Sequence, residues 1–231
     1  LIINVIENPI IQTVSIEGVK QKSVMNSLFD TLSLKNRSSF NLSTVKQDEK
    51  SILENLKSRG YYFSKVITSI NELSDNKIDL TYRIELGKKA KISKISFIGQ
   101  KIFKDSILRN IILSEEYKFW KIISGKKYLN EDIINFDKRL LSNFYKNKGY
   151  YNIKINSSYV NYLGDNQFEV IYNISSGKKY FFNNLSLNLP ADYDDSNFNV
   201  LREIFANLKG ENYSLNSIDK ILNEIDKIVL N

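Results

Sequence analysis

The chain has 231 residues, of which 42% are apolar and 26% charged, a composition that suits one or two packed domains or several small modules rather than a disordered tail. It contains no Cys and no His, which excludes disulfides, Cys-based zinc and iron–sulfur sites, and Ser-His-Asp or Cys-His catalysis. The net charge of +7 suits nucleic acid or an anionic surface, and equally a lysine-rich surface that has no partner.

The chain opens on a short apolar segment, residues 1–5, which predicts the last strand of a preceding repeat within residues 1–8. No apolar run approaches the roughly 18 residues of a membrane span. The start also lacks the basic region and cleavage site of a signal peptide. We therefore expect a mature, soluble, internal fragment of a longer array.

The first module, residues 9–87, starts with the alternating segment 14–18, which predicts a short half-buried strand ending at Gly18. Ser23 and Ser43 are the expected N-caps of two helices, and Gly60 ends the second helix as a C′ residue. The apolar stripes of the two helices are Val24, Leu28 and Leu32, and Val45, Ile52 and Leu56.

Two alternating segments follow Gly60 and are joined by turn residues 74–76. The second of them, residues 78–84, alternates without a break, so that one of its faces is buried. The predicted order of elements is β-α-α-β-β.

The same pattern returns in residues 88–178. Arg-Gly-Tyr-Tyr at 59–62 corresponds to Lys-Gly-Tyr-Tyr at 148–151, and the distance to the closing glycine is 27 positions from Gly60 and 28 from Gly149. Such matched spacing indicates a duplicated module. The stripe expected to face the core in its longer helix, capped by Asn130, is Ile133, Phe136, Leu140 and Phe144.

A third copy, residues 179–231, begins with a predicted strand at 185–189 and continues with two helical stripes, but includes no closing hairpin. Its second stripe is Ile218, Leu222, Ile225 and Val229. We therefore expect a truncated third module. The predicted fold class is α+β, with tandem β-α-α-β-β modules, each a three-stranded mixed sheet with two helices on one face.

The first module resembles the POTRA (polypeptide-transport-associated) repeat of BamA-like outer-membrane β-barrel assembly proteins. The resemblance is carried by Glu-Asn-Pro at 7–9, the strand ending at Gly18, two helices, Gly-Tyr at 60–61 and a hairpin ending at Gly87. The second module adds an aromatic segment, 117–128, similar to an insertion typical of the third repeat of that family. The resemblance implies that the chain runs from the end of repeat one, through repeats two and three, into repeat four.

The resemblance also implies a non-enzymatic function. It implies a periplasmic scaffold and receptor for unfolded outer-membrane proteins, which docks accessory lipoproteins and is attached in the full-length protein to a C-terminal membrane β-barrel. The expected location is the periplasmic side of the outer membrane. A related translocation and assembly or two-partner-secretion transporter would share the fold and differ in its client.

A nucleic-acid-binding module is a more distant alternative. Residues 88–178 contain 17 basic and 8 acidic residues, so the positive charge is concentrated in the second module. No RNP aromatic signature, zinc finger or GxxG clamp accompanies this charge, so we expect no nucleic acid partner.

Acidic pairs at 48–49, 115–116, 131–132 and 194–195 are candidates for general acid–base chemistry. Each is expected at a helix start or in a polar loop, where a carboxylate stays solvated. Residues 192–195 are not part of a calcium-binding loop motif. We therefore predict no catalytic residue, metal or cofactor.

Partner-binding residues are expected on a sheet edge. Ile153 and Ile155 share one parity whereas Val160 and Tyr162 share the other, which predicts a β-bulge and places residues 151–162 at the edge, with 168–174 at the centre. An unfolded client would add a strand there, although the bulge could equally protect an idle edge. The candidate contact residues are Tyr151, Ile153, Lys154, Ile155, Ser157, Ser158, Tyr159 and, in the aromatic segment, Trp120.

Overall fold

The structure, a computed structural model, describes residues 7–120, 125–190 and 194–230, and of residues 157–159 the backbone alone. The strand predicted at residues 1–5 therefore lies outside the described part. Contacts divide the chain into two compact units, residues 1–93 with 116–132 and 162–168, and the remainder. Within the described ranges, no helix combines the length and the apolarity that crossing a bilayer requires.

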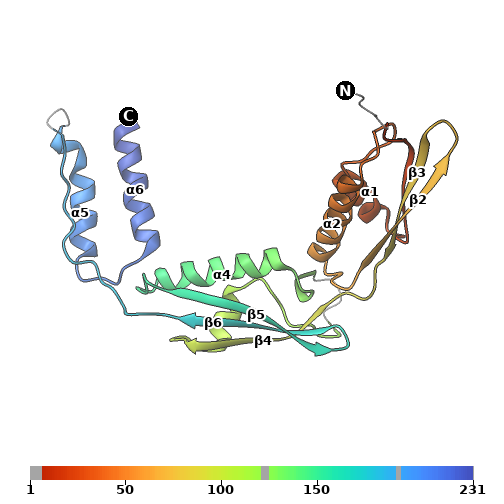
Figure 1. Cartoon of the computed structure of the whole chain (residues 1–231). Coiled ribbons are helices and arrows are strands. Elements are labelled where there is room, and N and C mark those ends of the chain that lie inside the picture. Colours follow the sequence, from red (N-terminus) through yellow and green to blue (C-terminus); the bar gives the residue numbers. More distant parts are fainter. Residues whose placement is uncertain (1–6, 121–124, 191–193, 231) are drawn as a thin grey trace, which may run out of the picture. The chain divides into compact units, whose positions relative to one another are not determined.

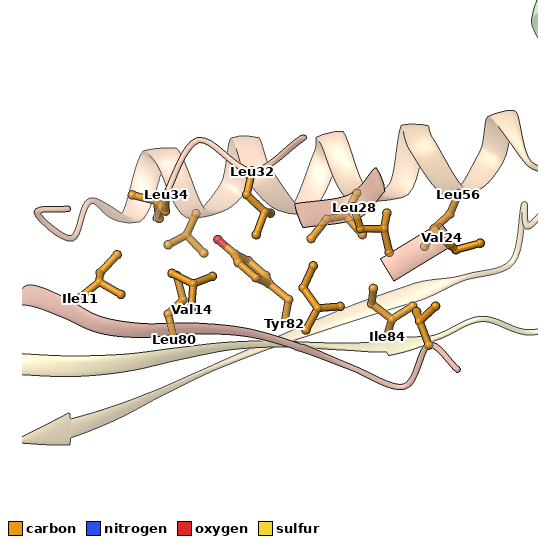
Figure 2. Packing of buried hydrophobic residues seen from close by; sticks show 14 of the residues in the cluster. Ile11, Val14, Val24, Leu28, Leu32, Leu34, Leu56, Leu80, Tyr82 and Ile84 are labelled. Atoms are coloured by element: carbon orange, nitrogen blue, oxygen red, sulfur yellow. The ribbon is translucent and has the colours of Figure 1, made fainter. Parts of the chain in front are cut away.

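The first module has the predicted order of elements (Figure 1). Its sheet has the order β1-β3-β2, with β1 parallel and β2 antiparallel to the central β3, so it is a mixed sheet. Both helices cover one face, and the apolar core lies between the two layers (Figure 2). The elements are β1 (Ile10–Glu17), α1 (Lys22–Thr31), α2 (Leu42–Ser58), β2 (Lys65–Leu73) and β3 (Lys77–Glu85).

The second module repeats this order, and the predicted α+β fold class is confirmed. Its sheet has the order β4-β6-β5, and a short 3₁₀ turn, Gly125–Lys127, precedes the longer helix. The main elements are β4 (Lys91–Gln100), α3 (Asp105–Ile111), α4 (Glu131–Lys146), β5 (Lys154–Gly164) and β6 (Gln167–Ser175).

Buried side chains alternate strictly with less buried ones along both central strands, β3 and β6. In β3 every second side chain is buried, and the same is true of β6. Because neighbouring side chains of a strand point to opposite faces, this pattern directs one complete row of each strand into the core. The buried rows are Ile78, Leu80, Tyr82 and Ile84 in β3, and Phe168, Val170, Tyr172 and Ile174 in β6.

The stripe predicted for α4 is wrong by one position. Phe136, expected in the core, is 39% exposed. The buried row contains a carboxylate, Asp137, so the apolar residues one position earlier along the chain gave the more regular hydrophobic pattern. The row that faces the core is Ile134, Asp137, Leu141 and Tyr145.

The N-cap predicted for α2 is also corrected. The helix begins at Leu42 and its N-cap is Asn41, whose Oδ1 accepts the N–H of Ser43 at 2.8 Å. Asn and Ser are comparable capping residues, and both occur here within three positions, so sequence preference alone does not choose between them.

Two glycines make equivalent backbone contacts beyond α2 and α4. The carbonyl of Gly60 accepts the N–H of Ala90 at 2.8 Å, and that of Gly149 accepts the N–H of Tyr180 at the same distance. Both have positive φ, 89° and 98°. The equivalent positions predicted from the matched spacing are confirmed.

Residues 179–231, predicted to be a third copy, contain in their described part a short 3₁₀ turn, η2 (Asp195–Phe198), and two helices, α5 (Asn199–Leu208) and α6 (Leu215–Leu230). The strand predicted at 185–189 is not formed. In the first module the corresponding strand, β1, is hydrogen-bonded to β3, which follows the second helix. In the described part of the chain no strand follows α6, so residues 185–189 have no such partner. Residues 185–189 instead contribute Leu187 and Leu189 to a small core against the helices.

A glycine near the end of each first strand allows close approach to the central strand. A Cβ at Gly99 would lie 2.5 Å from the carbonyl oxygen of Ile174, and a Cβ at Gly18 would overlap the carbonyl oxygen of Ile84. Both glycines also have positive φ. Two separate constraints therefore require glycine at these positions.

We predict that Gly99→Ala destabilises the second module more than Gly164→Ala does. Both positions have positive φ, 85° and 95°, but nothing lies within 4 Å of a Cβ at Gly164. The control substitution should cost about 1–2 kcal/mol through the backbone alone. Gly99→Ala should add the steric overlap, for a total of about 3 kcal/mol or more. Equal losses in urea unfolding would contradict the close approach.

Candidate functional site: the open edge of the second sheet

A three-stranded sheet has two edges, and in the first sheet the β1 edge is covered by a loop. The N–H of Ile11 donates to the carbonyl of Ser38 at 2.9 Å, and the carbonyl of Ile11 accepts the N–H of Arg37 at 2.7 Å. The N–H of Val14 donates to Oδ1 of Asn36 at 2.8 Å. These bonds occupy the groups that an added strand would need.

In the second sheet the β4 edge is covered in the same way. The carbonyl of Ile92 accepts the N–H of Tyr117 at 2.6 Å. The carbonyl of Ile95 accepts a guanidinium N–H of Arg109, also at 2.6 Å. The first strand of each module therefore has outward-facing backbone groups that are already hydrogen-bonded.

The remaining edges are β5 and β2. The sheet order confirms the prediction that β5 lies at an edge and that β6 is central. In the described ranges, residues 157–159 apart, no backbone hydrogen bond joins a loop to β5 or β2. The strand now seen as β2 was predicted, but not as an open edge, although the duplication that aligns Gly60 with Gly149 also aligns β2 with β5.

Of the two open edges, β5 is the less protected against pairing. It is the longer, with 11 residues against nine, and its only charged residue is Lys154. In β2 both Lys65 and Glu72 are charged. Charged side chains and short length are the usual means by which edge strands avoid pairing with other chains, so β5 is the edge more open to an added strand.

The predicted contact residues divide between surface and core. Lys154 is exposed and Ile155 half-buried, whereas Ile153 is buried and so faces inward. Tyr151 is largely exposed, with its ring 5.2 Å from that of Tyr213. The side chains of Ser157, Ser158 and Tyr159 lie outside the described part, so the bulge stays a prediction.

The other predicted contact residue, Trp120, lies in the aromatic segment of the second module. Its side chain is 62% exposed and packs edge-to-face against Phe119, with ring centroids 4.6 Å apart. It is separate from β5 in the sequence, and it is considered below.

A buried carboxylate positions the loops that cover β1. Asp48 is completely buried and accepts the N–H groups of Ser33 and Leu34 at 2.7 and 3.0 Å. The hydroxyl of Tyr82, on the central strand, donates to the same carboxylate at 3.3 Å. We call this arrangement the Asp–Tyr clasp. The expectation that Asp48 is solvated is wrong, because the loop after α1 folds over it and supplies donors in place of water.

The second module has the same clasp. Asp137 is completely buried and accepts the N–H groups of Leu113 and Ser114 at 2.6 and 3.2 Å, and the hydroxyl of Tyr172 donates to it at 2.8 Å. In both modules the aspartate is the seventh residue of the longer helix. The seventh residue of α6 is Ile221, which is buried in an apolar core. The clasp therefore belongs to the two complete modules.

The clasp changes the acidity of its tyrosines. Burial raises the pKa of Tyr82 and Tyr172 far above its usual value, and the neighbouring charge of Asp48 or Asp137 raises it further. Both hydroxyls therefore stay protonated and remain hydrogen-bond donors throughout the neutral range.

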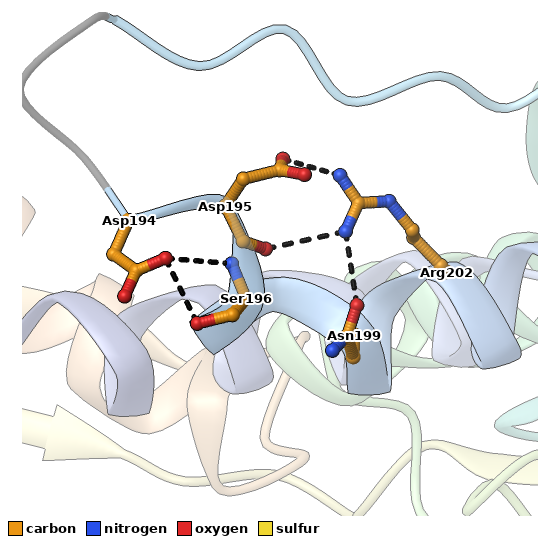
Figure 3. A network of polar contacts seen from close by, with 5 residues as sticks. All are labelled: Asp194, Asp195, Ser196, Asn199 and Arg202. Carbon is orange, nitrogen blue, oxygen red and sulfur yellow. Dashed lines mark hydrogen bonds and ion pairs between the residues drawn. The ribbon is translucent and has the colours of Figure 1, made fainter.

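The acidic residues before α5 stabilise a helix start. Oδ1 of Asp194 accepts the N–H of Ser196 at 3.0 Å, and Asp195 forms an ion pair with Arg202 (Figure 3). The partners are local, and no group of three or more acidic side chains able to hold a metal occurs in the described part of the chain. Asp192, the remaining acidic residue of this run, lies outside that part.

Comparison with known families matches most of the chain. The POTRA family model, described as "Surface antigen variable number repeat", matches residues 9–87 and 90–177. Among solved structures, the Haemophilus influenzae BamA POTRA3-5 structure superposes with a TM-score of 0.51 at 14% identity, covering 95% of this chain and 85% of that one. This likeness supports the fold.

Two curated relatives are outer membrane protein assembly factors BamA. The factor from Neisseria meningitidis serogroup B is 27% identical over 67% of this chain and 20% of its own length. The factor from Buchnera aphidicola is 26% identical over 99% of this chain and 37% of its own length. The chain thus spans between a fifth and two-fifths of these relatives.

We predict that Asp137→Asn destabilises the second module by about 3 kcal/mol, because an amide cannot accept all three hydrogen bonds and leaves buried donors unpaired. Tyr172→Phe removes one donor and should cost about 1 kcal/mol. The loss of unfolding free energy in the double variant should differ from the sum of the losses in the two single variants. Additive losses would show that the two groups do not interact.

We also predict that stability falls in alkaline solution. A tyrosine whose pKa is raised by folding contributes stability that is fully present below the unfolded pKa of about 10 and is lost as the pH rises towards the folded value. The free energy of unfolding should therefore decline above about pH 10, by up to about 1.4 kcal/mol per pH unit for each tyrosine. Tyr172→Phe should make this decline less steep. An unchanged slope in the variant would contradict the assignment.

Proposed function

The chain belongs to the POTRA family, and from this premise we propose that it is a non-enzymatic periplasmic scaffold that receives unfolded outer-membrane proteins during assembly of their β-barrels. The observation that carries the proposal is the open edge of β5, on a sheet whose other edge is covered. The relatives named as outer membrane protein assembly factors supply the class of client. The attached C-terminal β-barrel and the location at the periplasmic side of the outer membrane belong to the same proposal.

The mechanism is addition of a client strand to β5. An extended segment would form backbone hydrogen bonds with the outward-facing N–H and carbonyl groups of the strand. Such bonds involve no side chain, so clients of different sequence would bind the same edge. Val160 and Tyr162 lie on one face of β5, are exposed and offer apolar contacts for client side chains, beside the ring of Phe63, which lies 5.7 Å from that of Tyr162.

The scaffold would also dock accessory lipoproteins of the assembly machine. The second module is the favoured partner surface, because residues 88–178 carry a net charge of +9 whereas the rest of the chain carries −2. Complementary charge increases the rate of association and selects partners more than it adds affinity.

We test the edge with proline at two neighbouring positions of β5, Ile155 and Asn156. Adjacent N–H groups of an edge strand point in opposite directions, so one of the two donates to β6 and the other faces outward. Proline at the outward position should leave the fold intact, as judged by circular dichroism and melting. It should weaken binding of an outer-membrane β-strand peptide by about fivefold, the value of one hydrogen bond.

The matched control places proline at Ser69 and Ile70 in β2, the equivalent open edge of the first module. We expect peptide binding to be unchanged in the folded member of that pair. If proline in β2 abolishes peptide binding and proline in β5 does not, the site lies in the first module. If neither proline weakens binding, strand addition is refuted.

A further inference from the structure

Two adjacent aromatic side chains of the second module are exposed together. Phe119 is 79% exposed and Trp120 is 62% exposed, and their rings pack edge-to-face. The Nζ of Lys118 lies 5.7 Å from the centroid of the Trp120 ring. We call residues 118–120 the aromatic tip. Single exposed apolar residues are common, but a large adjacent pair indicates a contact surface.

The residue before the tip is firmly attached to the sheet. The N–H of Tyr117 donates to the carbonyl of Ile92 in β4 at 2.6 Å, and the Nζ of Lys91 lies 4.3 Å from the centroid of its ring. The tip therefore begins at a residue that is fixed to the sheet, while its two rings are exposed to solvent. Neither ring belongs to the buried core, so both are available to an external partner.

The charge around the tip favours an anionic partner. Residues 117–128 contain four lysines, Glu115 and Glu116 directly precede them, and the module as a whole has a net charge of +9. Lys118 and Lys126 are exposed. Long lysine side chains can lie along apolar groups while their ammonium groups reach phosphate.

We propose that the aromatic tip inserts into the interfacial layer of a membrane containing anionic phospholipid. Trp is enriched at the boundary between headgroups and acyl chains, because its ring is apolar and its N–H is polar. Phe119 adds apolar area, and Lys118 pairs with headgroup phosphate. Two large adjacent rings that are mostly exposed, beside a lysine, suit an anionic lipid surface.

This inference goes beyond the function proposed above and does not depend on client binding. It assigns one surface of the chain to lipid and leaves the β5 edge for the client. The two activities can therefore be measured separately, and failure of one leaves the other intact.

The test uses Trp120 itself, because the chain contains only one tryptophan. Vesicles of phosphatidylcholine with about 30% phosphatidylglycerol should shift its emission to the blue, and pure phosphatidylcholine vesicles should do so far less. Raising the salt concentration should weaken the effect, because screening reduces attraction to the anionic surface. Phe119→Ala keeps the reporter and should weaken vesicle binding by about three- to tenfold. Lys118→Ser should reduce the preference for anionic vesicles.

Phe181 provides a matched control. It is 59% exposed, and the Nζ of Lys179 lies 5.7 Å from its ring centroid, the same separation as between Lys118 and Trp120. Phe181→Ala should leave the vesicle response unchanged. An unshifted emission with anionic vesicles, or a response that occurs only with an unfolded outer-membrane peptide, would overturn the proposal. Equal weakening by Phe119→Ala and Phe181→Ala would overturn it as well.

Discussion

A carboxylate buried on the longer helix of each complete module determines which edge of the sheet is open. Asp48 and Asp137 have no access to water and depend on donors from two other parts of the module, the loop after the shorter helix and a tyrosine on the central strand. A buried carboxylate without such donors is strongly unfavourable, so the loop has little freedom to leave. Once it is held at residues 33–34 or 113–114, the chain that follows lies along the first strand and occupies its hydrogen-bonding groups. The other edge, formed by β2 or β5, stays available.

The proposed binding edge is therefore separate from the contacts that hold the module together. The clasp, the alternating central strand and the glycine near the end of the first strand keep the two layers together, and the edge strand at the far side takes part in none of these contacts. A client strand added to β5 would extend the sheet without disturbing the core. The aromatic tip follows the covering loop and lies outside the core too.

Much of this fold follows from local sequence rules. Glycines at matched spacing, Asp-Asn turns and unbroken alternation in residues 78–84 and 168–174 predict the duplicated module and its central strands. The edge position of β5 was predicted from the change of parity between Ile155 and Val160, and the sheet order confirms it. The clasp does not follow from local sequence rules, because a polar residue is predicted to face solvent unless the loop that covers it is known. For Asp137 this shifted the predicted stripe by one position, and for Asp48 it left a gap between Val45 and Ile52. The strand expected at 185–189 failed for a related reason, since a strand needs a partner that its own sequence does not specify.

Amide hydrogen exchange, followed residue by residue with and without an outer-membrane β-strand peptide, tests the link between clasp and open edge most directly. The amides of Leu113 and Ser114 should be protected almost as strongly as the core strands, although they lie in a loop. Addition of peptide should slow exchange at alternate amides of β5 and leave β4 unchanged. Loop amides that exchange freely, or peptide protection that appears on β4 rather than β5, would contradict the account.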